Sequence, residues 1–95
     1  MIRPRIVCRD GASVGVQASR GHYCKPTNNV GPYTHVEAEY PSVMPPESWQ
    51  KYAEFPDSDL YQSAIYPYLP WSCVEEFIEV HGGLDGEFDL PPTVR

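Results

Sequence analysis

The sequence predicts an α+β fold, in which a small, mostly antiparallel sheet is packed by a C-terminal helix. Three observations lead to this prediction. An Asp-Gly pair near the N-terminus separates two strand-like segments and is a strong hairpin signal. Residues 33–40 alternate in polarity, as a half-buried strand does. Residues 70–81 have the periodicity of an amphipathic helix, with start and stop signals at its ends.

The N-terminal hairpin is expected to consist of strands over residues 5–9 and 13–18. Asp10 and Gly11 form the tight turn between them, because both residue types tolerate the positive φ of a primed turn. The inward face of the second strand then carries three small apolar residues: Val14, Val16 and Ala18.

A long connection over residues 19–32 follows, rich in glycine, proline and asparagine, with Tyr23 as its expected inward anchor. The third strand, residues 33–40, separates two faces. Its core face is predicted to hold Thr34, Val36, Ala38 and Tyr40. Its outer face is predicted to hold Tyr33, His35, Glu37 and Glu39.

Residues 41–69 are punctuated by proline, so short elements are expected there. Residues 45–55 are compatible with a short helix that covers the sheet, and residues 57–59 with a turn. A fourth strand is predicted over residues 60–66, where Pro67 either ends it or confines it to a sheet edge. The aromatic residues expected to cover the sheet are Trp49, Tyr52 and Phe55.

The C-terminal helix is the clearest element. Pro70 suits a first helical position and Gly82 a left-handed stop. One stripe of the helix is apolar: Val74, Phe77, Ile78 and His81. Three residues are expected to pin the following tail to the body: Leu84, Phe88 and Leu90. Residues 91–95 are expected to fray.

The 95 residues, 41% of them hydrophobic and 13% aromatic, are enough for one modest core, so residues 1–95 are expected to form a single domain. The longest apolar runs are a few residues, far below the roughly 20 that a bilayer requires. We therefore expect a soluble, intracellular protein. An odd number of separated cysteines favours reduced thiols, although a bridge between Cys8 and Cys24 stays open.

The net charge of −6 is divided unevenly along the chain. Residues 1–25 carry five basic residues against one acid, whereas residues 26–95 carry two basic residues against twelve acids. An acidic C-terminal part would repel phosphate, so nucleic-acid binding is disfavoured there and a basic partner is favoured. An acidic surface also serves solubility alone.

A metal site is not predicted, although Cys8, His22 and Cys24 are potential ligands, as are His35, Cys73 and His81. The single residue between His22 and Cys24 is too short for a usual zinc pair, and no second close pair completes a tetrahedron. A small metal-binding or structural domain that uses Cys8, His22 and Cys24 remains the alternative hypothesis.

An enzyme is not predicted either. Cys73 lies in the first helical turn, where the macrodipole favours a thiolate, but Glu75 and Glu76 oppose that charge. The carboxylate pairs at Glu37 with Glu39 and Glu75 with Glu79 are typical of solvated faces. No phosphate loop, nucleophile elbow or metalloprotease motif occurs. A cysteine-dependent enzyme is the third hypothesis, and no cofactor is expected.

A protein-binding surface is the best-supported site. Aromatic residues of the kinds enriched at interface hot spots cluster just before and at the start of the helix: Tyr61, Tyr66, Tyr68 and Trp71. Six carboxylates follow, and they are expected to form an acidic ridge: Glu75, Glu76, Glu79, Asp85, Glu87 and Asp89. Such a ridge imitates nucleic-acid phosphates and would dock onto arginines and lysines.

Four pieces of the sequence resemble a group of small accessory proteins encoded by bacteriophages and prophages: residues 5–19, 22–24, 31–37 and 81–83. The resemblance covers the N-terminal half and the final helix. It implies an accessory gene product, and such products include inhibitors of host defence, anti-CRISPR proteins among them, that act by stoichiometric binding. No catalytic or binding residue is carried over from it.

The leading hypothesis is therefore a non-enzymatic, phage-type inhibitor in the bacterial cytoplasm. Its expected partner is a host protein or ribonucleoprotein with a basic surface, such as a CRISPR effector. Direct binding to nucleic acid or to membranes is not expected.

Overall fold

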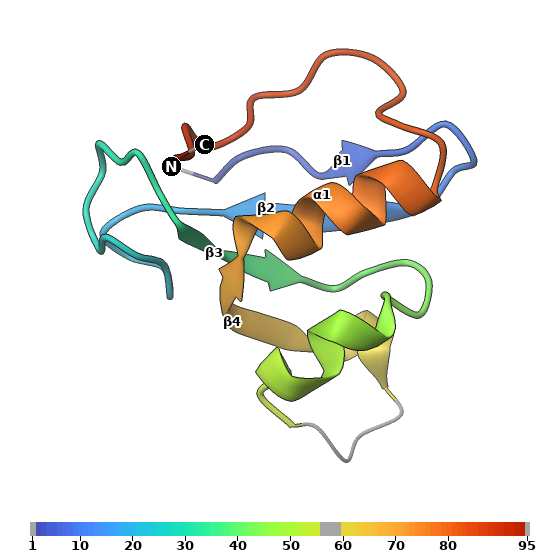
Figure 1. The fold of residues 1–95 in the computed structure, drawn as a ribbon, viewed down its shortest axis with the longest axis horizontal. Coiled ribbons are helices and arrows are strands. Elements are labelled where there is room, and N and C mark those ends of the chain that lie inside the picture. Colours follow the sequence, from blue (N-terminus) through green and yellow to red (C-terminus); the bar gives the residue numbers. More distant parts are fainter. Residues whose placement is uncertain (1, 56–59, 95) are drawn as a thin grey trace.

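Four antiparallel strands form one sheet, in the order β1-β2-β3-β4, in the computed structural model, which describes residues 2–55 and 60–94. The strands are β1 (Ile6–Val7), β2 (Ser13–Gln17), β3 (His35–Glu39) and β4 (Ile65–Pro70). Figure 1 shows the helix α1 (Trp71–Val80) crossing in front of the sheet, with the 3-10 helix η1 (Glu47–Tyr52) in front of β4. The predicted α+β fold is confirmed.

The N-terminal hairpin forms as predicted, with a longer turn. Ile6 pairs with Val14, and β1 ends at Val7. The turn is held by Asp10, whose Oδ1 accepts a 2.9 Å hydrogen bond from the backbone N–H of Ala12. Gly11 adopts a φ of 94°, which a residue with a Cβ rarely does. The three residues predicted to face inward from the second strand are all buried, although Ala18 follows the end of β2 at Gln17.

The core lies between the sheet and the two helices. Trp49 is fully buried at its centre, with its ring centroid 5.3 Å from that of Phe77 and 5.2 Å from that of Tyr66. The apolar stripe of α1 faces this core, since Val74 and Phe77 are fully buried and Ile78 packs against them at its margin. The predicted short helix is thus present as η1, although Phe55 is 68% exposed and covers nothing.

The fourth strand lies later than predicted. Residues 61–63 form a 3-10 turn instead, and β4 begins at Ile65. Pro67 is inside the strand, which is at the sheet edge, as proline requires. Val36 pairs with Leu69 whereas Ala38 pairs with Tyr66, so two residues of β4 lie opposite one residue of β3. This bulge accommodates the missing N–H of proline.

The ends of α1 are locally encoded. Pro70 is the N-cap rather than the first helical residue, because the helix begins at Trp71. At the C-terminus, Gly83 N–H donates to the carbonyl of Ile78 (2.8 Å) and Gly82 N–H to that of Glu79 (3.1 Å). These two bonds make a Schellman motif, in which Gly82 has a φ of +88°. The predicted stop at Gly82 is therefore confirmed.

The C-terminal tail is more ordered than predicted. Leu84 bridges to Cys8 beside β1, and Phe88 and Leu90 pack against the core, as expected for residues that pin the tail. The expected fraying of residues 91–95 is wrong for residues 91–94. The backbone N–H of Tyr33 donates to the carbonyl of Pro92 (2.8 Å), and the carbonyl of Tyr33 accepts from the N–H of Val94 (2.9 Å). Residue 95 lies outside the described residues.

The burial of the two tyrosines around the long connection is the reverse of the prediction. Tyr23, the predicted anchor, is 53% exposed, whereas Tyr33, predicted to face outward, is fully buried. The hydroxyl of Tyr33 donates a 2.6 Å hydrogen bond to the carbonyl of Asn28, which ties the connection to the core. Thr34 and Tyr40 are exposed rather than inward, because β3 spans only His35–Glu39.

The carboxylate pair of β3 is not a solvated face. Glu37 is 7% exposed and accepts a 3.1 Å hydrogen bond from the backbone N–H of Tyr23. Desolvation by burial, then the charge of Glu37, raises the pKa of Glu39 above its usual range. The turn predicted at residues 57–59 lies outside the described residues. No helix among the residues described is long and apolar enough to cross a bilayer.

Candidate protein-binding groove

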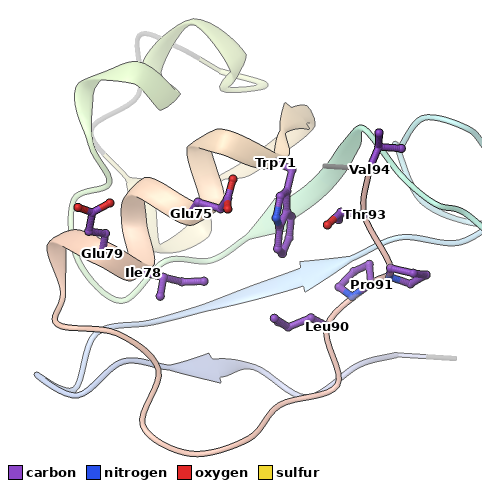
Figure 2. A pocket seen from close by; sticks show the side chains of 9 residues that line it. Trp71, Glu75, Ile78, Glu79, Leu90, Pro91, Thr93 and Val94 are labelled. Atoms are coloured by element: carbon purple, nitrogen blue, oxygen red, sulfur yellow. The ribbon is translucent and has the colours of Figure 1, made fainter.

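A groove of about 820 Å³ separates α1 from the C-terminal tail. Figure 2 shows its two walls, with Trp71, Glu75, Ile78 and Glu79 projecting from α1 on one side and the tail on the other. The tail wall consists of five consecutive residues: Leu90, Pro91, Pro92, Thr93 and Val94. The groove is therefore built from one regular element and one extended segment.

The helical wall follows from the sequence spacing. Trp71, Glu75 and Glu79 are four residues apart and lie on one row of α1, with Ile78 beside them. Because Val74 and Phe77 are buried in the core, this row lies away from the sheet's centre, and its members line the groove. In Figure 2, Trp71 and Ile78 point toward the tail. Trp71 is held at the start of the row by its backbone N–H, which donates to the carbonyl of Thr34 (3.1 Å).

The tail wall is held by the core beneath it. Pro91 is buried, and the segment from Pro92 to Val94 pairs with Tyr33 in a short parallel bridge. Leu90 packs against the hydrophobic core. The tail residues 90–94 therefore contact the rest of the protein on one side and line the groove on the other.

The two groove glutamates carry unbalanced charge. Within residues 2–55 and 60–94, the carboxylates of Glu75 and Glu79 have neither an ion-pair nor a hydrogen-bond partner, and both residues are exposed. Two other acids have a charged neighbour: Asp10 Oδ2 lies 2.7 Å from His81 Nδ1, and Asp89 Oδ2 lies 3.7 Å from Arg3 Nε. The groove consequently offers two carboxylates to a cation.

Trp71 supplies an aromatic wall next to these carboxylates. Its side chain is half-buried, and its indole N–H has no hydrogen-bond acceptor in the part of the chain that the structure describes. A tryptophan with an apolar face and a free donor is typical of interface anchors. With Ile78 and Leu90 as apolar lining, the groove suits a segment that is both apolar and positively charged.

The six predicted carboxylates do not form one continuous ridge. Glu75 and Glu79 face the groove, whereas Glu76 turns toward η1 and accepts a hydrogen bond from the hydroxyl of Ser48. Three others belong to the tail: Asp85 and Glu87, which are exposed, and Asp89, which neighbours Arg3. The acidic surface is thus divided among separate parts of the molecule.

The predicted tyrosine anchors are separated as well. Tyr66 is 3% exposed and packs edge-on against Trp49, so its assignment as a partner-binding residue is wrong. Tyr68 is 40% exposed at the bulge, where its ring lies 5.8 Å from that of Tyr23. Of the predicted aromatic residues, Trp71 is the one in the groove.

The tail wall is not among the sites that the sequence predicts. Leu90 was expected to pin the tail, but the residues after it were expected to fray rather than to line a site. The run from Leu90 to Pro92 is the signal that points to it, because an apolar residue followed by two prolines forms an extended, low-entropy segment suited to packing.

The cysteines give no support to a metal site or a nucleophile. All three are free and buried, and the Cys24 thiol donates to the carbonyls of Ser19 (3.2 Å) and Pro26 (3.4 Å). Burial raises the pKa of the Cys73 thiol. The hydrogen bond with Ser48 opposes this more strongly than the Glu76 carboxylate reinforces it, but burial outweighs both. Across the described ranges, no three His, Cys, Asp or Glu residues are grouped to hold a metal ion.

No family model, no curated protein and no solved structure matches this chain. The groove is therefore interpreted from its own geometry and charge.

Proposed function

We propose that the protein acts by stoichiometric, non-enzymatic binding to a basic surface of another protein, and that the groove between α1 and the tail is its contact site. The observation that carries this proposal is the row of Trp71, Glu75 and Glu79 along a groove that also has apolar lining, with both carboxylates unpaired within the described residues. Aromatic anchors beside uncompensated charge favour an oppositely charged partner.

The finer proposal is an inhibitor that occupies a nucleic-acid-binding surface. Carboxylates and phosphates are recognised by the same arginine and lysine geometry, so an acidic protein can take the place of a nucleic acid. Residues 26–95 carry twelve acids against two basic residues, which supplies long-range attraction to such a surface. The resemblance to phage-encoded accessory proteins makes a bacterial defence complex, such as a CRISPR effector, the first partner to test.

The test compares two charge-matched variants in capture from bacterial lysate. The groove variant combines Glu75→Gln with Glu79→Gln, and the tail variant combines Asp85→Asn with Glu87→Gln, so each loses two carboxylates. We expect the groove variant to lose at least about tenfold in capture, as loss of about 1.4 kcal/mol of binding free energy requires. The tail variant should lose less, through screened long-range attraction only.

The captured protein is then identified and incubated with its own nucleic acid. Release of the bound protein by that nucleic acid, at constant ionic strength, is the expected result for competition at one surface. Equal capture by the two variants would exclude the groove as the contact site. Undiminished capture in the presence of saturating nucleic acid would exclude the inhibitory mode.

A further inference from the structure

We infer that the groove takes one extended segment carrying an arginine, whose guanidinium lies against Trp71 and Glu75 while the segment's backbone pairs with Thr93. This inference rests on the proposed function and specifies the chemistry that its site recognises. It depends on two features of the groove that the charge argument does not use: the free backbone of the tail and the order of side chains along α1.

Thr93 presents an unused backbone edge. Its neighbours Pro92 and Val94 supply the carbonyl and the N–H that bond Tyr33, at 2.8 and 2.9 Å. Successive residues of an extended strand direct their polar groups to opposite sides, so the N–H and carbonyl of Thr93 point away from Tyr33. In the residues that the structure describes, neither group has a hydrogen-bond partner.

An unpaired edge beside a groove is the arrangement used for strand addition. The ligand backbone supplies the main-chain hydrogen bonds, and alternate side chains enter the groove. Figure 2 places Thr93 on the tail, across the groove from Trp71 on α1. A side chain that leaves a segment paired with Thr93 therefore meets the helical wall.

The helical wall favours arginine among the cationic side chains. Trp71 and Glu75 are four residues apart on α1, and residues at that spacing have Cβ atoms about 5–6 Å from each other. A planar guanidinium stacks on an indole and donates two parallel hydrogen bonds to a carboxylate, whereas an ammonium is a point charge without that geometry. Glu79, one turn further, adds a second negative charge.

A purely apolar segment fits less well, because it would desolvate Glu75 and Glu79 without compensation. A second copy of this chain fits less well too, since each copy has a net charge of −6 and the groove is itself acidic. The occupant that satisfies the apolar lining, the carboxylates and the free edge together is an extended segment with an arginine.

The test is an NMR titration of the ¹⁵N-labelled protein with acetyl-Ser-Val-Arg-Val-Ser-amide. Saturable shifts are expected at the Thr93 amide and the Trp71 indole N–H. The same peptide with citrulline in place of arginine, which keeps the shape and removes the charge, should bind at least tenfold more weakly. The lysine peptide should bind several-fold more weakly, and a peptide with N-methylated valines should lose the Thr93 shift.

Two variants complete the design. Glu75→Gln should lower the affinity for the arginine peptide at least fivefold. Glu87→Gln removes an exposed carboxylate from the tail, outside the groove, and should leave the affinity for this peptide unchanged. Dispersed amide spectra are the control that both variants are folded. Equal affinity for the arginine and citrulline peptides, or shifts that map away from the groove, would overturn the inference.

The outcomes also separate this inference from the proposed function. Groove-dependent capture of a basic protein, with no binding of the arginine peptide, defeats the inference and leaves the proposed function standing. Peptide binding at the groove, with equal protein capture by the groove and tail variants, defeats the proposed function instead. If neither groove-dependent capture nor binding of the arginine peptide is observed, both the proposed function and the inference are wrong.

Discussion

The indole N–H of Trp49 donates a 2.9 Å hydrogen bond to the backbone carbonyl of Cys73, and this bond joins η1 to the first turn of α1. It is a buried contact between segments 24 residues apart in the sequence. The ring of Trp49 also packs on Phe77 and Tyr66, so one side chain links both helices to β4. The position of α1, and with it the helical wall of the groove, depends on this link.

We expect Trp49→Phe to lower the free energy of unfolding by about 1–3 kcal/mol, because the variant loses a buried hydrogen bond and leaves a small cavity. Urea denaturation measures it. Trp71→Phe is the matched control, since Trp71 is half-buried and its indole N–H has no acceptor among the described residues. A loss as large in Trp71→Phe would contradict the importance assigned to the Trp49 bond.

Gly82→Ala tests the C-terminal stop of α1. Gly82 has a φ of +88°, and an added Cβ would meet only an ordinary contact at 3.6 Å, so the cost comes from the backbone conformation alone. A left-handed residue with a Cβ costs about 1–2 kcal/mol, and we expect a loss of that size on thermal or urea unfolding. Gly21→Ala, at a position without positive φ, should change stability by less than about 0.5 kcal/mol.

Asp10 makes part of the stability dependent on pH. Its hydrogen bond from the Ala12 N–H and then that with His81 lower its pKa below the ordinary value of 3.8. The native state therefore binds this proton less readily than the unfolded state does. The contribution of Asp10 is present above pH 3.8 and is lost as the pH falls through the lowered native pKa.

The measurement is urea unfolding of the wild type and Asp10→Asn at neutral pH and at several values below pH 3.8. We expect the variant to be less stable at neutral pH and the difference to shrink as the pH falls. A difference that stays constant over the acidic range would show that the carboxylate charge has no role at this turn.

The elements with local signals were predictable from the sequence. The hairpin, the apolar stripe of α1 and the stop at Gly82 each depend on neighbouring residues, which a sequence displays directly. The predicted burial of Tyr23 and exposure of Tyr33 are both wrong, because these properties depend on residues distant in the sequence. The burial of Tyr33 depends on residues 92–94, about sixty positions away in the chain, and alternation within one strand carries no information about such a partner.

The groove was predictable only in part for the same reason. The spacing of Trp71, Glu75 and Glu79 is local, so the helical wall follows from the sequence. The tail wall forms because Tyr33 pairs with the segment around Thr93, a tertiary contact. Glu76 was expected on the same ridge as Glu75 and Glu79, but a tertiary contact directs it elsewhere. Its hydrogen-bond partner is Ser48 on η1, 28 positions away in the sequence. A single acidic ridge was therefore expected from residues that tertiary structure separates.

The three thiols are expected to react slowly in the native protein. Burial raises the pKa of Cys73 and Cys8, so little thiolate is present at neutral pH, and all three side chains are buried. A thiol-reactive dye should label no cysteine rapidly before denaturation and three afterwards. Rapid native labelling at Cys73 would contradict this expectation and would favour a cysteine-dependent enzyme.

The two faces of α1 should separate stability from binding. Phe77 is fully buried, with its ring 5.3 Å from Trp49 and 4.7 Å from His81, so Phe77→Ala should cost about 3–5 kcal/mol. Val80, on the same helix and 63% exposed, gives the control: Val80→Ala should change stability by less than about 0.5 kcal/mol.

Glu75→Gln completes the comparison, because Glu75 is exposed and its carboxylate has no partner within the described residues. It should leave the urea midpoint nearly unchanged while lowering the affinity of the groove for its ligand. If Glu75→Gln lowered stability as Phe77→Ala does, the carboxylate would have a structural role and its loss of binding would carry no information about recognition. Stability retained with binding lost assigns the carboxylate to the partner, because a folded groove that differs by one charge isolates the electrostatic contact.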